Sequence, residues 1–155
     1  YICIVSTKNI IDTAKDYYFN QWRNHEKISP AFGEKVYITR LGWNHICYCK
    51  RRLLADKIIR LKKLPLAREL IETATTYQTV RKVGIYTQYG FRAIKDDTVI
   101  KVVVSQKEGS AKKLLYSVMF KSLIHQRQYI VNKKNDKKIR KFKDENPKPF
   151  IRRRN

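Results

Sequence analysis

The sequence predicts an α+β fold, in which N-terminal helices pack on one face of a four-stranded antiparallel sheet and a basic C-terminal tail follows. Apolar residues recur at helical spacing in the first half of the chain and alternate with polar ones between residues 77 and 120. This order, helices first and a run of strands afterwards, is typical of α+β domains. Hydrophobic residues make up 43% of the 155 residues, which suffices for one core.

Helical patterns come in three stretches. Residues 7–27 predict an amphipathic helix, whose apolar face comprises Ile10, Ile11, Ala14, Tyr18 and Trp22. A turn is predicted at "SPAFGEK", a short strand at "KVYIT", and a helical start at "GWNHIC". Residues 50–74 predict two helices that meet at Pro65, because proline suits the first turn of a helix.

Four β-rich runs follow, namely "YQTVRKVG", "IYTQYGFRAI", "TVIKVVVSQ" and "KLLYSVMF". The short connections "KDD" and "KEGS" indicate antiparallel hairpins. Alternation gives the sheet one apolar face, which we expect to meet the helices. The other face offers Gln88, Arg92, Lys101, Ser105 and Ser117. This face is either an ordinary solvent-exposed surface or the floor of a phosphate-binding cleft.

The charge balance points to a polyanionic partner. The net charge is +22, and residues 121–155 hold thirteen Lys or Arg against three Asp or Glu. Such a field attracts phosphate backbones, so nucleic acid is the leading partner class, ahead of an anionic membrane surface or an acidic protein. No apolar run is long enough to span a bilayer. We expect an N-terminal helix and linker at 1–34, a core at 35–120 and a basic helix or tail at 121–155.

His45 is the histidine in the middle of the chain, and its chemistry suits RNA cleavage. That reaction needs a base for the 2′-hydroxyl, an acid for the leaving oxygen and cations for the phosphate. Histidine serves as acid or base near neutral pH, although a histidine at a helix start is also a common structural group. A zinc site at His45, Cys47 and Cys49 is disfavoured because a fourth ligand is missing. We therefore expect no metal and no cofactor.

The segments "VYITRLGWNHI", "RLKKLPLARELIE", "VIKVVVSQKEG" and "LLYSVM" resemble, in this order, the nuclease domains of the barnase/EndoU/colicin/RelE superfamily that are associated with phages and polymorphic toxins. The resemblance covers roughly residues 35–120. It implies a metal-independent RNase that cuts tRNA or other RNA in the cytoplasm, delivered there as the C-terminal part of a longer polypeptide. It also implies an acidic immunity or antitoxin protein as a partner.

The resemblance maps the histidine of "GWNHI" to His45 and the serine of "YSVM" to Ser117. Where such domains often carry a cation, this chain has Gln106 followed by Lys107. The catalytic candidates are His45, Arg92, Lys101, Tyr116 and Ser117. The RNA-binding candidates are Arg51, Arg52, Arg81, Gln88, Gln106 and Lys107.

Three functions fit these features. The first is a metal-independent endoribonuclease with His45 as general acid or base and a 2′,3′-cyclic phosphate as product. The second is a non-catalytic RNA-binding or ribosome-associated protein. The third is a module whose first helix or basic tail binds an acidic protein.

Overall fold

The structure is a computed structural model that describes residues 7–145, without the side chains of residues 125–130, 139 and 142–145. Contacts divide the chain into two units, residues 1–121 and residues 122–155. The first unit contains four α-helices and a six-stranded sheet among its described residues, and the second contains one long helix. The α+β class predicted from the sequence is therefore confirmed.

The first predicted helix is present. It begins as α1 (Thr7–Asp16), widens into the π-helix η1 (Tyr17–Trp22) and ends in the 3-10 turn η2 (Arg23–His25). Its predicted apolar face is the buried one, since Ala14, Tyr18 and Trp22 all belong to the hydrophobic core. Short π-helical segments often occur near functional sites.

The other predicted helices of this unit are α2 (Arg40–Tyr48), α3 (Leu54–Lys62) and α4 (Leu64–Thr73). The hydroxyl oxygen of Thr39 caps α2 by accepting a hydrogen bond from the backbone N–H of Gly42 at 3.4 Å. Pro65 lies in the first turn of α4, as the sequence predicts.

The sheet is larger than predicted and is not purely antiparallel. Its strands are β1 (Ile28–Ser29), β2 (Glu34–Tyr37), β3 (Thr79–Val83), β4 (Tyr86–Lys95), β5 (Thr98–Lys107) and β6 (Lys113–Ser122). They lie in the order β1-β2-β6-β5-β4-β3, and β2 pairs with β6 in parallel. The four-stranded antiparallel sheet expected from the sequence is therefore corrected to an open mixed sheet of six strands.

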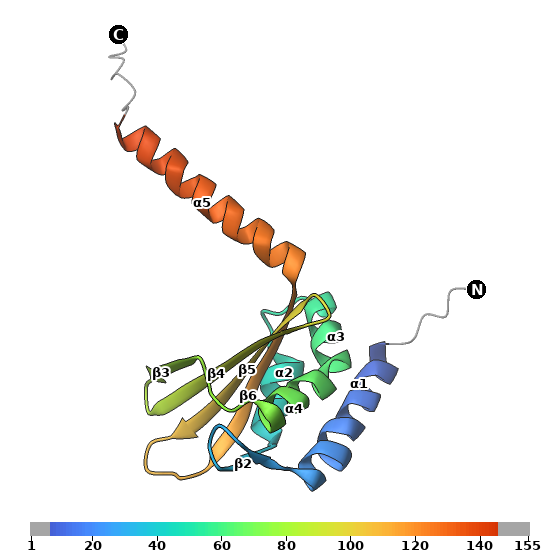
Figure 1. Ribbon diagram of the computed structural model, residues 1–155. Coiled ribbons are helices and arrows are strands. Elements are labelled where there is room, and N and C mark those ends of the chain that lie inside the picture. The colour runs from blue at the N-terminus through green and yellow to red at the C-terminus, as the bar shows by residue number, and fades with distance from the viewer. Residues whose placement is uncertain (1–6, 146–155) are drawn as a thin grey trace, which may run out of the picture. The chain divides into compact units, whose positions relative to one another are not determined.

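The helices cover one face of this sheet (Figure 1). Apolar side chains of the three central strands point into the core that the helices share. They are Phe91 of β4, Ile100, Val102 and Val104 of β5, and Val118 of β6. The apolar face predicted from strand alternation is confirmed at these positions. The opposite face, which we call the open face, carries the residues of opposite parity on β3, β4 and β5.

Helices replace a neighbouring strand along most of the outer side of β6. The pairing of β2 with β6 comprises only Val36 with Lys113 and Tyr37 with Leu114. Beyond it, Gly42 of α2 lies against the backbone carbonyl of Leu115. Farther along, the guanidinium of Arg60 donates to the carbonyl of Val118. A helix therefore packs against one part of the edge of β6, and a buried cation satisfies a carbonyl farther along.

The basic C-terminal segment forms the helix α5 (Leu123–Glu145). Its described side chains from Val131 to Lys138 are all exposed, so this part of the helix is solvated on every side. Among the residues that the structure describes, no helix is long and apolar enough to cross a membrane. Residues 146–155, the end of the predicted tail, lie outside the described range.

Candidate nucleic-acid interface and catalytic corner

The side chain of His45 lies between α2 and β6. Its ring stacks on the ring of Tyr116, with centroids 4.2 Å apart and planes inclined by 25°. Burial lowers the pKa of His45 below its ordinary value of 6.5, and the positive charges of Arg52 and Arg60 lower it further. The imidazole is therefore neutral at neutral pH and able to accept a proton, while remaining partly exposed to solvent.

The two arginines near His45 are held by the fold. Arg52 Nη1 donates to the carbonyl oxygens of His45 at 2.8 Å and Ile46 at 2.5 Å, in the last turn of α2. Arg52 Nε also lies 3.3 Å from Asp56, which accepts from Arg60 Nε at 2.9 Å. Arg52, which was predicted to bind RNA, thus holds the end of α2 in place. Arg60 was not among the site residues predicted from the sequence.

Arg51, unlike the neighbouring Arg52, does not fold back onto α2. Its side chain is exposed in the turn that follows α2, on the same loop as Arg52. The sequence "KRR" shows three consecutive cations, but it does not show which one folds back onto the helix. Lys50 and Arg51 are the two that are exposed to solvent and remain available to a phosphate.

The open face carries most of the other predicted residues. The register of β4 and β5 pairs Gln88 with Ser105 and Arg92 with Lys101, so each pair shares this face. Arg92 and Lys101 are both exposed, and neither side chain forms an ion pair or hydrogen bond with a described residue. Two like charges directly opposite each other repel, so the pair favours a bound anion.

Polar side chains form a row next to this pair. Arg81 of β3 lies opposite Gln88 and donates to its side-chain oxygen from Nε at 3.0 Å and Nη2 at 2.9 Å. Gln88 and Ser105 are 8% and 6% exposed. Lys107 is exposed at one end of the face, opposite Tyr86. Among the residues that the register assigns to this face on β3, β4 and β5, none is acidic.

Gln106, another predicted RNA-binding residue, does not lie on the open face. Its parity is that of Val104, so it lies on the helix-covered side, where its side-chain oxygen accepts from the Tyr89 hydroxyl at 3.1 Å. Its amide nitrogen donates to the carbonyl of Ser110 at 2.8 Å, which braces the turn between β5 and β6. Both ends of this predicted RNA-binding side chain are thus used inside the fold.

The predicted catalytic residues do not gather in one place. Tyr116 stacks on His45, so its ring lies against α2. Ser117 is buried, at 6% exposed, whereas Arg92 and Lys101 lie exposed on the open face. The structure therefore offers two candidate regions, a corner at His45 and Tyr116 and a basic surface on the open face.

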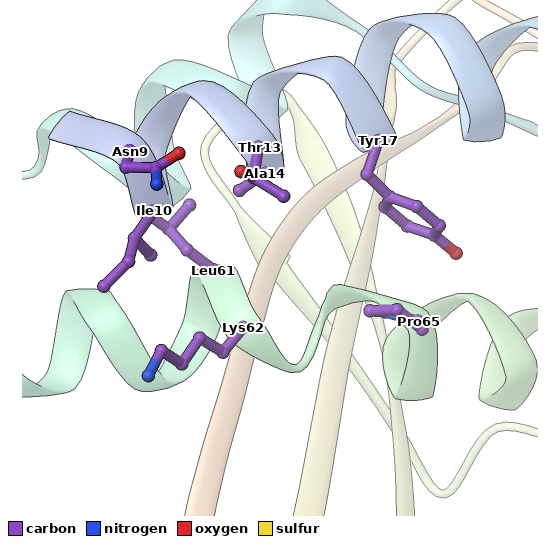
Figure 2. A pocket seen from close by; sticks show the side chains of 8 residues that line it. All are labelled: Asn9, Ile10, Thr13, Ala14, Tyr17, Leu61, Lys62 and Pro65. Atoms are coloured by element: carbon purple, nitrogen blue, oxygen red, sulfur yellow. The ribbon is translucent and has the colours of Figure 1, made fainter. Parts of the chain in front are cut away.

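Two hollows in the first unit lie between helices. An apolar one of about 370 Å³ separates α1 from α3 and α4, and none of the residues that line it was predicted to be catalytic or RNA-binding (Figure 2). Another, of about 270 Å³, lies between the first helix and α2 and is lined by cations and aromatic rings. The part of the chain that the structure describes has no group of three or more His, Cys, Asp or Glu arranged to hold a metal.

Comparison with protein-family models, with curated proteins and with solved structures finds no match for this chain. Its function is therefore inferred from the geometry of these regions.

Proposed function

We propose that the protein is a metal-independent endoribonuclease with His45 as its general base. The observation that carries the proposal is the position and protonation state of the His45 imidazole. Its imidazole is held by the ring of Tyr116, is partly exposed, and has a pKa below 6.5. A base must be unprotonated before it acts, so a lowered pKa keeps His45 in the useful form at neutral pH.

In the proposed reaction the imidazole takes the proton of an RNA 2′-hydroxyl, and the resulting oxygen attacks the adjacent phosphorus. The bond from O2′ to phosphorus forms while the bond from phosphorus to O5′ breaks. The O5′ atom gains a proton from solvent, so the products carry a 2′,3′-cyclic phosphate and a 5′-hydroxyl. Arg51, one of the two exposed cations on the loop after α2, stabilises the charge developing on the phosphate.

RNA is the proposed substrate because both the whole chain and its surfaces attract polyanions. The net charge is +22, and the open face is free of acidic side chains over β3, β4 and β5. By the resemblance to toxin-associated nucleases, the proposal extends to tRNA as the preferred RNA and to action in a cytoplasm. It also extends to an acidic immunity or antitoxin protein that would neutralise the basic surface.

The decisive experiment is incubation of the purified protein with total RNA in the presence of EDTA. We expect fragments that end in 2′,3′-cyclic phosphate, and His45→Ala should reduce cleavage at least a hundredfold. The matched control is His25→Ala, since His25 is exposed and remote in sequence. If His45→Ala cleaves as fast as the unmodified protein, His45 is not the base. Sequencing the RNA ends formed in expressing cells would identify the substrate.

A second candidate function is RNA binding without cleavage. It is favoured by the pair Arg92 and Lys101, which lies on the open face rather than beside His45. Under this hypothesis the unmodified protein produces no fragments, while replacing both cations by Gln lowers RNA affinity. Fragments that require His45 would exclude it.

A further inference from the structure

The hollow between the first helix and α2 has the lining expected of a nucleotide site. It encloses about 270 Å³ and is bordered by the cations Lys15, Arg23 and Arg40, together with the rings of Phe19 and Trp43. The exposed amide of Asn44 lies at its rim, one turn before Tyr48, which also lines it.

The lining side chains come from two helices, and on each helix most of them are spaced four residues apart. Lys15, Phe19 and Arg23 are four residues apart on the first helix. On α2, Arg40 and Asn44 are likewise four apart. Side chains at this spacing share a face of a helix, so two basic and aromatic faces border one hollow.

The charges of the hollow are not neutralised within the protein. None of Lys15, Arg23 and Arg40 forms an ion pair with a described residue, and the guanidinium of Arg23 lies 5.9 Å from the centre of the Phe19 ring. The acidic residues Asp12 and Asp16 border a neighbouring hollow that also includes Lys15. Asp16 accepts hydrogen bonds from Asn20 and Gln21, so it is engaged on its own helix.

We propose that this hollow binds one nucleotide of a single-stranded RNA. The cations Arg40 and Lys15 would hold its phosphate, because phosphate is the anion that accepts several charge-assisted hydrogen bonds at once. Trp43 is buried against Phe19, so the rings that remain for the base are the partly exposed Phe19 and the exposed Tyr48. Asn44 offers both a donor and an acceptor to the base edge. This inference rests on the proposed function in so far as RNA is the ligand.

The hollow lies close enough to His45 to position an RNA strand for cleavage. Asn44 and His45 are consecutive in α2, so their side chains leave the helix about 100° apart. The hollow and the catalytic corner therefore lie on two flanks of one helix. An RNA strand that crosses the exposed side of α2 reaches both, with the nucleotide in the hollow setting which bond lies at His45.

The test measures binding of a fluorescein-labelled 2′-O-methyl RNA pentanucleotide by fluorescence anisotropy. Such a strand has no 2′-hydroxyl to attack the phosphate, so the result does not depend on cleavage. Arg40→Gln and Lys15→Gln should each weaken binding about tenfold, and Asn44→Ala should weaken it by a smaller factor. Lys8→Gln is the matched control, because it removes the same charge from an exposed position on α1 outside the hollow.

These variants separate the possible results. All four replaced side chains are exposed, and unchanged circular dichroism would show that the variants fold. Binding equal to that of Lys8→Gln would overturn the inference, whether or not the protein cleaves RNA. Competition by inorganic phosphate as strong as by a nucleoside monophosphate would also overturn it, since the hollow would then hold an anion and no base. If the variants lose affinity and no cleavage occurs, the nucleotide site stands and the nuclease proposal fails.

Discussion

The imidazole of His45 lies on the phenol ring of Tyr116, 4.2 Å from centroid to centroid. This contact joins α2 to β6, and it also keeps water from one face of the imidazole. Burial is the largest cause of the lowered pKa of His45, so the ring of Tyr116 supports the protonation state on which the proposed base depends.

Removing the ring should raise the pKa of His45. In Tyr116→Ala, water reaches the imidazole, and we expect the pKa to move up toward 6.5. The measurement is an NMR titration of the histidine ring protons, with the exposed His25 as internal reference. Tyr116→Phe keeps the ring and should leave the titration unchanged. An equal shift in both variants would mean that the hydroxyl, rather than the stacked ring, controls His45.

The stability of the protein should depend on pH through the same group. The pKa of His45 is lower in the folded state than the ordinary 6.5 of the unfolded state, so the unfolded chain takes up this proton first as the pH falls. The free energy of unfolding should be fully retained above about pH 6.5 and decrease as the pH falls through the lowered pKa. Urea unfolding of His45→Gln should show a flatter dependence over this window, and identical curves would contradict the assignment.

Gly42→Ala should destabilise the first unit by about 3 kcal/mol. A Cβ atom at this position would overlap the backbone carbonyl oxygen of Leu115 and lie 2.7 Å from the hydroxyl of Tyr18. Neither group moves easily, since one belongs to a strand and the other is buried and donates to the carbonyl of Thr39 at 2.9 Å. Asn44→Ala, an exposed change on the same helix, should alter the denaturation midpoint little. Equal midpoints for both variants would show that α2 does not pack this closely on β6.

Arg60→Met should cost about 3 kcal/mol of unfolding free energy. Arg60 is 8% exposed and donates to the Val118 carbonyl and to Asp56. Methionine fills similar space but leaves the carbonyl of the strand edge without a donor. Arg51→Met, at an exposed position in the loop before α3, should change stability by less than about 0.5 kcal/mol. A small effect at Arg60 would mean that water replaces the guanidinium.

The basic helix α5 should contribute to RNA affinity through counterion release. Replacing the exposed Lys134 and Lys138 by Gln should reduce the slope of log affinity against log salt concentration by about 1 to 1.5. Replacing Lys8 and Lys35 in the first unit removes the same charge and should change the slope less. Equal slopes would show that α5 makes no phosphate contacts.

Local patterns in the sequence predicted the elements well, because each depends on neighbouring residues. The four-residue spacing of Ala14, Tyr18 and Trp22 and the alternation around Phe91 and Val102 gave the correct helix and the correct sheet faces. The pairing of β2 with β6 could not be predicted in this way. It joins Val36 to Lys113, and no local pattern records a contact between residues so far apart.

The candidate site was predictable only in part for a similar reason. Alternation predicted that Arg92 and Lys101 share a face, and the register confirms it. The composition of a basic run does not reveal that Arg52 folds back to cap α2. The hollow lined by Lys15 and Arg40 was missed, although cations and aromatic residues at four-residue spacing in both helices were a visible signal.

Arg60 of α3, which donates to the edge of β6, also affects whether a further strand can add to the sheet. A strand from another molecule that added to β6 would need the carbonyl of Val118, which Arg60 already occupies, and would have to expel a buried charge to reach it. β3 forms one end of the sheet and carries five exposed residues, including Arg81 and Lys82. Any peptide that extends this sheet there must therefore meet a positively charged border, which admits an acidic strand and repels a second copy of the same chain.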